Sequence, residues 1–155
     1  MAKITFEANV EWTKSDQEVF VGNKFNRAHW WQFDGGVSVP ATASHHIVPV
    51  PYSKPENVDP EQAFIVALSS CHMMAFLTVA SKKKYVVENY VDQAFGTLEQ
   101  GEDGKFAMTE VTLRPNICFS GSRQPSKDVM KKMHHVAHEN CFIANSVKTQ
   151  INIEV

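Results

Sequence analysis

One long apolar segment, AFIVALSSCHMMAFLTVA from Ala63 to Ala80, constrains the fold more than any other part of the chain. Its residues are apolar except for two serines, one threonine and His72. A helix that is apolar on every side has to be covered on every side. A chain of 155 residues with two predicted helices has little material for this cover, so we infer that a second copy supplies part of it.

The start of this helix is marked by residues that favour a helix N-terminus. Asp59 suits the N-cap, Pro60 the first helical position, and Gln62 lies three residues after the cap. Glu61 in the first turn suits the helix dipole. The segment approaches the length of a membrane span. Polar residues interrupt it and charges bracket it closely, so we expect the central helix of a soluble protein and no membrane partner.

Alternation of apolar and polar residues, together with turn signals, predicts the remaining elements. We expect strands, in chain order, over residues 4–12, 18–33, 37–43, 86–99, 105–119 and 147–155. A proline-rich connection covers 45–58, a hairpin turn 101–104, and a second helix 125–139. The order βββ-α-ββ-α-β clusters strands instead of alternating them with helices. It predicts an α+β fold with a largely antiparallel sheet, in a single domain over 1–155.

Charge and cysteine content restrict the classes of function. The formal net charge is −2, and no basic stripe is present, so nucleic acid is not an expected partner. The N-terminal segment lacks the apolar stretch of a signal peptide, which favours a cytoplasmic location. In that reducing compartment a disulfide framework is not expected. Cys71, Cys118 and Cys141 are then either inert core residues or redox-active thiols, and Cys118, on a strand, is interpreted as core.

Taken one at a time, the cysteines and histidines favour structural roles. His72 lies about 100° round the helix from Cys71, so the two do not pair, and His72 is interpreted as a structural histidine. His134, His138 and Cys141 share one helical face by spacing, and both imidazole and thiolate are zinc ligands. No fourth ligand lies nearby in the sequence. A metal site therefore stays an alternative, and the main prediction contains neither a metal nor another cofactor.

Three segments, read together, carry a more specific signal than any one of them. DPEQAFIVALSSCHMMAFLTVA, ENCFIANSVKTQINIEV and NRAHWWQFDGG resemble the central-helix motif, the second-cysteine segment with the final strand, and the arginine-bearing N-terminal segment of the OsmC/Ohr family. These are thiol peroxidases, and the resemblance covers nearly the whole chain. It implies an OsmC-like fold, with antiparallel sheets around a long buried central helix, in an intertwined homodimer.

The resemblance also implies roles for four residues. Cys71 matches the peroxidatic cysteine, Cys141 the resolving cysteine, Glu61 the glutamate at the helix start and Arg27 the arginine. The chain departs from the family in two places. Its connection over 45–58 is longer and richer in proline, and a phenylalanine follows Cys141 where many members have proline. These departures concern substrate preference more than the chemistry.

A site of this kind needs a cation beside the reactive sulfur. The thiolate is the form that attacks peroxide, and burial raises the pKa of a thiol. Arg27 is the candidate because it stays charged when buried, and Glu61 would pair with it and aim it. Glu61 and Cys71 lie about 15 Å apart along one helix and do not touch. Either an arginine bridges them or the glutamate of a partner chain approaches, which again favours a dimer.

The resemblance therefore implies a two-cysteine, thiol-dependent peroxidase of the oxidative-stress response. It would reduce organic hydroperoxides, and hydrogen peroxide less well, through a Cys71 sulfenic acid and a Cys71–Cys141 disulfide. A dithiol reductant of the dihydrolipoyl type would restore the thiols. Seven residues are expected to line an apolar pocket: Trp30, Trp31, Phe33, Phe64, Met73, Met74 and Phe76. The alternatives are a non-catalytic binding or stress-associated member of the same fold, and a metal-binding protein that uses His134, His138 and Cys141.

Overall fold

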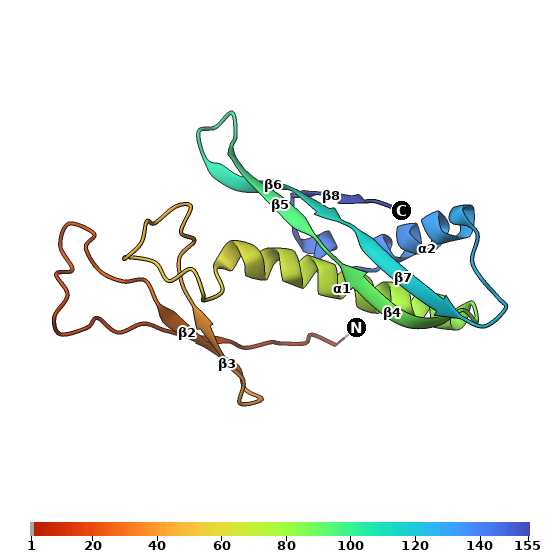
Figure 1. Ribbon diagram of the computed structural model, residues 1–155, viewed down its shortest axis with the longest axis horizontal. Helices are drawn as coiled ribbons and strands as arrows, with labels where there is room; N and C mark the ends of the chain where they lie inside the picture. The colour runs from red at the N-terminus through yellow and green to blue at the C-terminus, as the bar shows by residue number, and fades with distance from the viewer. Residues whose placement is uncertain (1) are drawn as a thin grey trace. The chain divides into compact units, whose positions relative to one another are not determined.

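The computed structural model describes residues 2–155 (Figure 1). The described residues form two compact units, which meet in the sequence between Ala63 and Phe64. The elements in chain order are β1 (Asn9–Glu11), β2 (His29–Gln32), β3 (Ser38–Ala41), α1 (Pro60–Lys82), β4 (Val86–Asp92), β5 (Phe95–Gln100), β6 (Phe106–Leu113), β7 (Pro115–Ser120), α2 (Lys127–Glu139), the 3-10 helix η1 (Ala144–Ser146) and β8 (Gln150–Ile153).

The first unit contains the antiparallel sheet β1-β2-β3. Trp31 in β2 lies opposite Val10 in β1 and Val39 in β3. The strands are those predicted, but β1 and β2 are much shorter. The segment predicted as one strand over 18–33 is broken by Gly22 and Asn23, which both adopt positive φ angles of 87° and 63°. Left-handed residues of this kind end a strand, and the Gly-Asn dipeptide was a turn signal that the prediction did not use.

Helix α1 begins as the sequence predicts. The Asp59 carboxylate accepts a hydrogen bond from the Gln62 backbone N–H at 2.8 Å, and the Gln62 side chain accepts one from the Asp59 N–H at 3.0 Å. This reciprocal pair satisfies two donors at the helix start. The helix ends where Lys84 adopts a left-handed conformation with φ 62°, and the Tyr85 N–H bonds the Ala80 carbonyl at 3.0 Å. This is the Schellman pattern of a helix C-terminus.

The second unit contains two helices and two small sheets. One sheet pairs β4 with β7, and the other has the order β5-β6-β8. The pairs β4–β7 and β5–β6 are antiparallel, as predicted, whereas β8 pairs with β6 in parallel. The parallel pair was not predicted, because alternation identifies a strand but carries no information about its direction.

Each of the two long predicted strands in this unit divides between both sheets. The division falls at residues 93–94 and at Arg114, so the observed order is βββ-α-ββββ-α-β. Asp92 accepts a hydrogen bond from the Arg114 N–H at 2.6 Å and another from the Ser69 hydroxyl of α1. The Arg114 side chain donates to the Gln93 carbonyl at 2.8 Å. This corner therefore turns the chain from one sheet to the other and ties it to α1.

The core of the second unit consists of two hydrophobic clusters that share α1. In the first, Phe76 and Ala80 pack against Met133 and Ala137 of α2 and against the β4–β7 sheet. In the second, Leu68 packs against Val111 and Leu113 of β6. Among the described residues, α1 is the one helix long and apolar enough to cross a membrane. Its residues Leu68, His72, Phe76 and Ala80 are buried at intervals of four, which is typical of the core helix of a soluble fold.

Candidate active site

The two helices of the second unit bring Cys71 and Cys141 together. Cys71 lies in the middle of α1, and Cys141 follows Asn140, the C-cap of α2. Cys71 lies close enough to Cys141 to act on the pKa of its thiol. Cys141 is buried, with 1% of its surface exposed, and its sulfur accepts the Ala144 N–H at 3.5 Å, whereas Cys71 is only half-buried. Both sulfurs are free thiols, so the geometry brings a reachable thiol next to an enclosed one.

Burial also determines the protonation state of Cys141. Burial raises the pKa of Cys141 to about 11, and the neighbouring Cys71 acts in the same direction. The backbone N–H of Ala144 opposes this rise. Cys141 is therefore protonated at neutral pH, and a protonated thiol is a poor nucleophile. Of the two sulfurs, Cys71 is the one placed to meet a small molecule from outside.

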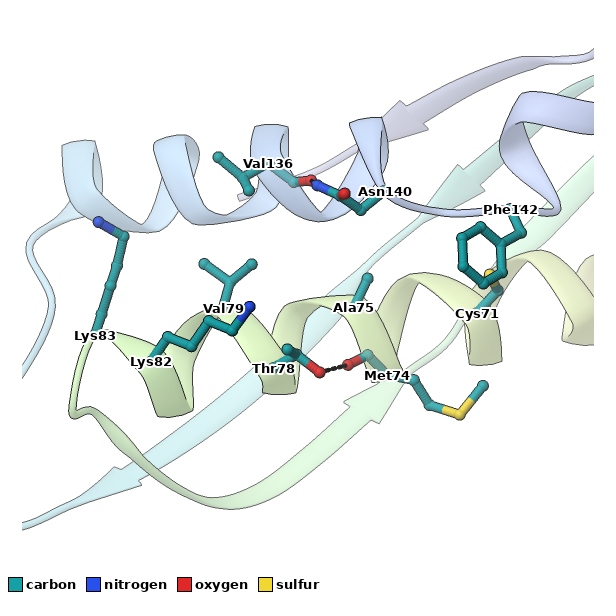
Figure 2. A pocket seen from close by; sticks show the side chains of 10 residues that line it. All are labelled: Cys71, Met74, Ala75, Thr78, Val79, Lys82, Lys83, Val136, Asn140 and Phe142. Atoms are coloured by element: carbon teal, nitrogen blue, oxygen red, sulfur yellow. Dashed lines mark hydrogen bonds between the residues drawn. The ribbon is translucent and has the colours of Figure 1, made fainter. Parts of the chain in front are cut away.

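Cys71 opens into a pocket of about 760 Å³ between α1 and the end of α2 (Figure 2). Its walls are mostly apolar and include Met74, Val79, Val136 and Phe142. Figure 2 shows Cys71 and Phe142 at one end of this pocket. The volume is in the range of small-molecule sites.

The aromatic and methionine residues expected around the thiol divide between the two units, and only those of the second unit can be compared with the pocket. Only Met74 lines the pocket with Cys71. Phe76 is fully buried in the first core cluster, and Phe64 packs against the second. Trp30 and Trp31 are residues of β2 in the first unit. The prediction went wrong at Phe76 because hydrophobicity alone does not distinguish a core side chain from one that lines a pocket.

Arg27 and Glu61 are not hydrogen-bonded to each other. The Arg27 guanidinium donates to the backbone carbonyls of Asn23, at 2.9 Å, and Phe25, and lies 3.7 Å above the Phe25 ring. The Oε2 atom of Glu61 is buried and has no hydrogen-bond partner. Buried carboxylate oxygens are normally paired, so Glu61 retains the capacity to accept a donor.

A pair of buried histidines, His72 of α1 and His134 of α2, joins the two helices. The Nε2 atom of His72 and the Nδ1 atom of His134 are 3.0 Å apart, and both side chains are almost completely buried. Burial lowers the pKa of each to about 4, and for His72 the neighbouring His134 and His138 add to this effect while Asp92 opposes it. Both imidazoles are therefore neutral at pH 7. His72 is buried, as expected of a structural histidine, but its Nδ1 atom and the Nε2 atom of His134 have no hydrogen-bond partner.

The alternative metal site on α2 is not assembled. The His134 ring is bonded to His72, and within residues 2–155 no group of three or more His, Cys, Asp or Glu side chains is arranged to hold a metal ion. Cys118 was expected in the core, but it is exposed on β7. Ile117 and Phe119 on either side of it pack against the core, so the alternation of the strand places Cys118 on the opposite face, a signal that the prediction did not use.

Sequence reasoning also missed polar residues at the pocket. Lys82, Lys83 and Asn140 line it with Cys71. A signal was present in the spacing. Cys71, Ala75, Thr78 and Lys82 recur at helical intervals and so share one face of α1. Tracing that face from the cysteine would have reached the first lysine.

The fold and the thiol pair together define the class of protein. The family model described as OsmC-like protein matches residues 53–155, and the chain belongs to this family. The N-terminal part, including Arg27, lies outside that match. No curated protein matches the chain.

Solved structures extend the likeness to the whole chain. An OsmC-like protein of unknown function from Vibrio cholerae is 51% identical, with a TM-score of 0.96, over 98% of this chain and 99% of that one. The organic hydroperoxide resistance protein OsmC from Legionella pneumophila is 17% identical, with a TM-score of 0.71, over 99% and 96%. The organic hydroperoxide resistance protein OhrB of Bacillus subtilis is 20% identical, with a TM-score of 0.62, over 96% and 98%. The last two show the fold alone.

Proposed function

We propose that this protein is a thiol-dependent peroxidase that reduces organic hydroperoxides and, less well, hydrogen peroxide. The observation that carries the proposal is the pairing of two free thiols: Cys71, which opens into an apolar pocket, and its neighbour Cys141, which is buried. Two fold relatives named organic hydroperoxide resistance proteins support the same activity. An apolar wall favours an alkyl hydroperoxide over hydrogen peroxide, because it gains from burying the alkyl group.

The reaction divides between the two sulfurs. The Cys71 thiolate attacks the terminal oxygen of the hydroperoxide, the O–O bond breaks, and the alkoxide leaves as alcohol after taking a proton. Cys71 is then a sulfenic acid. The Cys141 thiol condenses with it, a disulfide forms and water leaves. A dithiol, which we propose to be of the dihydrolipoyl type, reduces the disulfide by exchange and is itself oxidised to a disulfide.

Arg27 and Glu61 are proposed to complete the site in a homodimer. The thiolate of Cys71 needs a positive neighbour, and Glu61 offers a buried oxygen without a hydrogen-bond donor. Arg27 paired with that oxygen would supply the cation. The three free thiols fit the reducing cytoplasm, which we propose as the location.

The test follows hydroperoxide consumption with a dithiol reductant. We expect Cys71→Ser to lose turnover by at least about a thousandfold, since it removes the nucleophile. Cys141→Ser is expected to form the sulfenic acid but to recycle slowly, whereas Cys118→Ser is the matched control and is expected to keep wild-type turnover. Mass spectrometry of the oxidised wild type should show a Cys71–Cys141 disulfide. Full turnover by Cys71→Ser contradicts the proposal, and wild type without any turnover favours a non-catalytic binding protein.

A further inference from the structure

His29, the first residue of β2, is bonded through both nitrogens of its ring. Its Nε2 atom lies 3.0 Å from the indole Nε1 of Trp31, and its Nδ1 atom lies 2.6 Å from the backbone carbonyl oxygen of Arg27. Residues two apart in a strand point to the same face, which brings the rings of His29 and Trp31 together. The imidazole therefore links the backbone of Arg27 to the sheet of the first unit.

These two contacts determine which ring nitrogen carries the proton. An indole N–H can only donate a hydrogen bond, so Nε2 of His29 accepts and carries no proton. A carbonyl oxygen can only accept, so Nδ1 carries the proton and donates it to Arg27. One form of the ring satisfies both bonds, the neutral imidazole with its proton on Nδ1. An imidazolium loses the bond from Trp31, because both of its nitrogens are donors.

The bond from His29 completes the fixation of Arg27 in its loop. The Arg27 N–H donates to the Tyr52 carbonyl at 2.9 Å, and the Arg27 carbonyl accepts from His29. The Ala28 N–H, next in the chain, donates to the Asn26 side chain at 2.7 Å. The peptide groups on both sides of Arg27 are thus held. A functional side chain is placed accurately when the backbone that carries it is held by such bonds.

The charged groups of this region favour the neutral ring. The Arg27 guanidinium donates to backbone carbonyls of its own loop, and the Glu18 carboxylate accepts the Asn26 N–H at 3.1 Å. On β3, Ala41 lies opposite His29. Within residues 2–155 no carboxylate is bonded to the His29 ring. A second proton would therefore place an uncompensated positive charge two residues from Arg27.

Resting on the proposed function, we infer that His29 is a positioning residue, which fixes the backbone from which Arg27 acts as the cation of the reactive thiol. The neutral imidazole holds the Arg27 carbonyl through one nitrogen and is held by Trp31 through the other. In this role His29 transfers no proton and takes no part in bond breaking. Protonation of the ring releases Trp31 and sets a like charge near Arg27, so acid weakens the arrangement.

Two substitutions separate the two bonds of the ring. The amide group of His29→Asn reaches about as far as Nδ1, so it can still donate to the Arg27 carbonyl. The longer side chain of His29→Gln reaches about as far as Nε2, so it can accept from Trp31 but leaves the Arg27 carbonyl without its donor. If His29 acts through Arg27, the asparagine variant should be tolerated and the glutamine variant should not.

Alkylation by iodoacetamide tests this without any hydroperoxide, because the thiolate is the form that reacts. All proteins carry Cys118→Ser, which removes the exposed thiol and leaves Cys71 as the reachable one. At pH 7 we expect His29→Gln to lower the alkylation rate by about 3- to 10-fold, as for one lost hydrogen bond, and His29→Asn by less than about twofold. The exposed His46→Gln is the matched control and should react like its parent.

A double substitution and a spectrum show whether the effect passes through Arg27. In an Arg27→Met background, His29→Gln should cause no further loss, because the residue it positions is gone. Nitrogen NMR of the protein without substitution at His29 should show Nδ1 protonated and Nε2 bare at pH 8. The Trp31 indole N–H resonance, assigned with Trp31→Phe, should shift as the His29 ring takes up its second proton, and should not do so in His29→Gln.

The outcomes separate this inference from the peroxidase proposal. Equal losses for His29→Asn and His29→Gln overturn the inference, as does a loss that persists in the Arg27→Met background or a protonated Nε2 at pH 8. If hydroperoxides are reduced while His29→Gln is alkylated like its parent, the proposed function stands and the inference fails. If no hydroperoxide is reduced while the alkylation rates follow the expected order, the proposed function fails and the positioning role of His29 stands.

Discussion

At the scale of single residues, burial decides which groups carry charge. His72 and His134 share a hydrogen bond in the core, and both have a pKa lowered to about 4. Cys141 has its pKa raised to about 11 by the same cause. The spacing placed His134 and Cys141 on one helical face, and the family resemblance implied that Cys71 and Cys141 act together. It could not predict the His72–His134 bond, because the two residues lie on different helices and only their packing joins them.

The histidine pair predicts a loss of stability in mild acid. An imidazole with a folded pKa near 4 and an unfolded value near 6.5 takes up protons first in the unfolded chain. The free energy of unfolding should therefore fall as the pH drops from about 6.5 to 4, by up to about 3 kcal/mol for each imidazole. Urea unfolding at several pH values measures this. His72→Phe/His134→Leu should flatten the dependence, whereas the exposed His135→Asn should not; identical slopes in all three proteins contradict the prediction.

At the scale of elements, local signals predicted helix ends far better than strand ends. The reciprocal cap of α1 was readable from Asp59 and Gln62 alone. Ser126 caps α2 with a single bond, which its hydroxyl accepts from the Val129 N–H at 3.3 Å. The boundary between β4 and β5 depends instead on Asp92, which bonds Ser69 and Arg114 from two other elements. A strand that changes sheets at a contact with a distant helix leaves no periodic trace in the sequence.

The cap of α1 allows a test at this scale. Asp59→Ala removes the acceptor for the Gln62 N–H, and we expect it to lower the free energy of unfolding by about 1 kcal/mol. Asp59→Asn keeps an acceptor oxygen at the same position and should lose only a few tenths of that amount. Chemical denaturation of both variants measures the difference. Equal losses for alanine and asparagine would show that the carboxylate charge, and not the cap, is what matters.

At the scale of the whole molecule, the sequence predicted the α+β class and the family, and the comparisons confirm both. It did not predict the parallel β6–β8 pair, since strand direction depends on the path of the chain through α2. Exposed apolar side chains remain on several elements, among them Val66 of α1 at 65% and Phe106 of β6 at 67%. Apolar side chains exposed on a single chain are typical of an interface, and this supports the proposed homodimer.

The dimer is tested by sedimentation. We expect a mass twice the 17.4 kDa of the chain for wild type. Val66→Glu places a charge on the exposed face of α1, and we expect it to shift the mass toward that of one chain without unfolding, because the residue is exposed within its own chain. Val66→Ala should stay dimeric. A wild-type protein that sediments as a single chain at micromolar concentration contradicts the proposal.

In the proposed reaction, the unequal enclosure of Cys71 and Cys141 also determines which sulfur of the disulfide the reductant attacks. An incoming reductant meets the Cys71 side of the bridge, because Cys141 has almost no surface of its own. The transient mixed disulfide then forms on Cys71, and Cys141 is the sulfur that departs. A thiol-trapping reagent applied during turnover should therefore modify only one of the two cysteines.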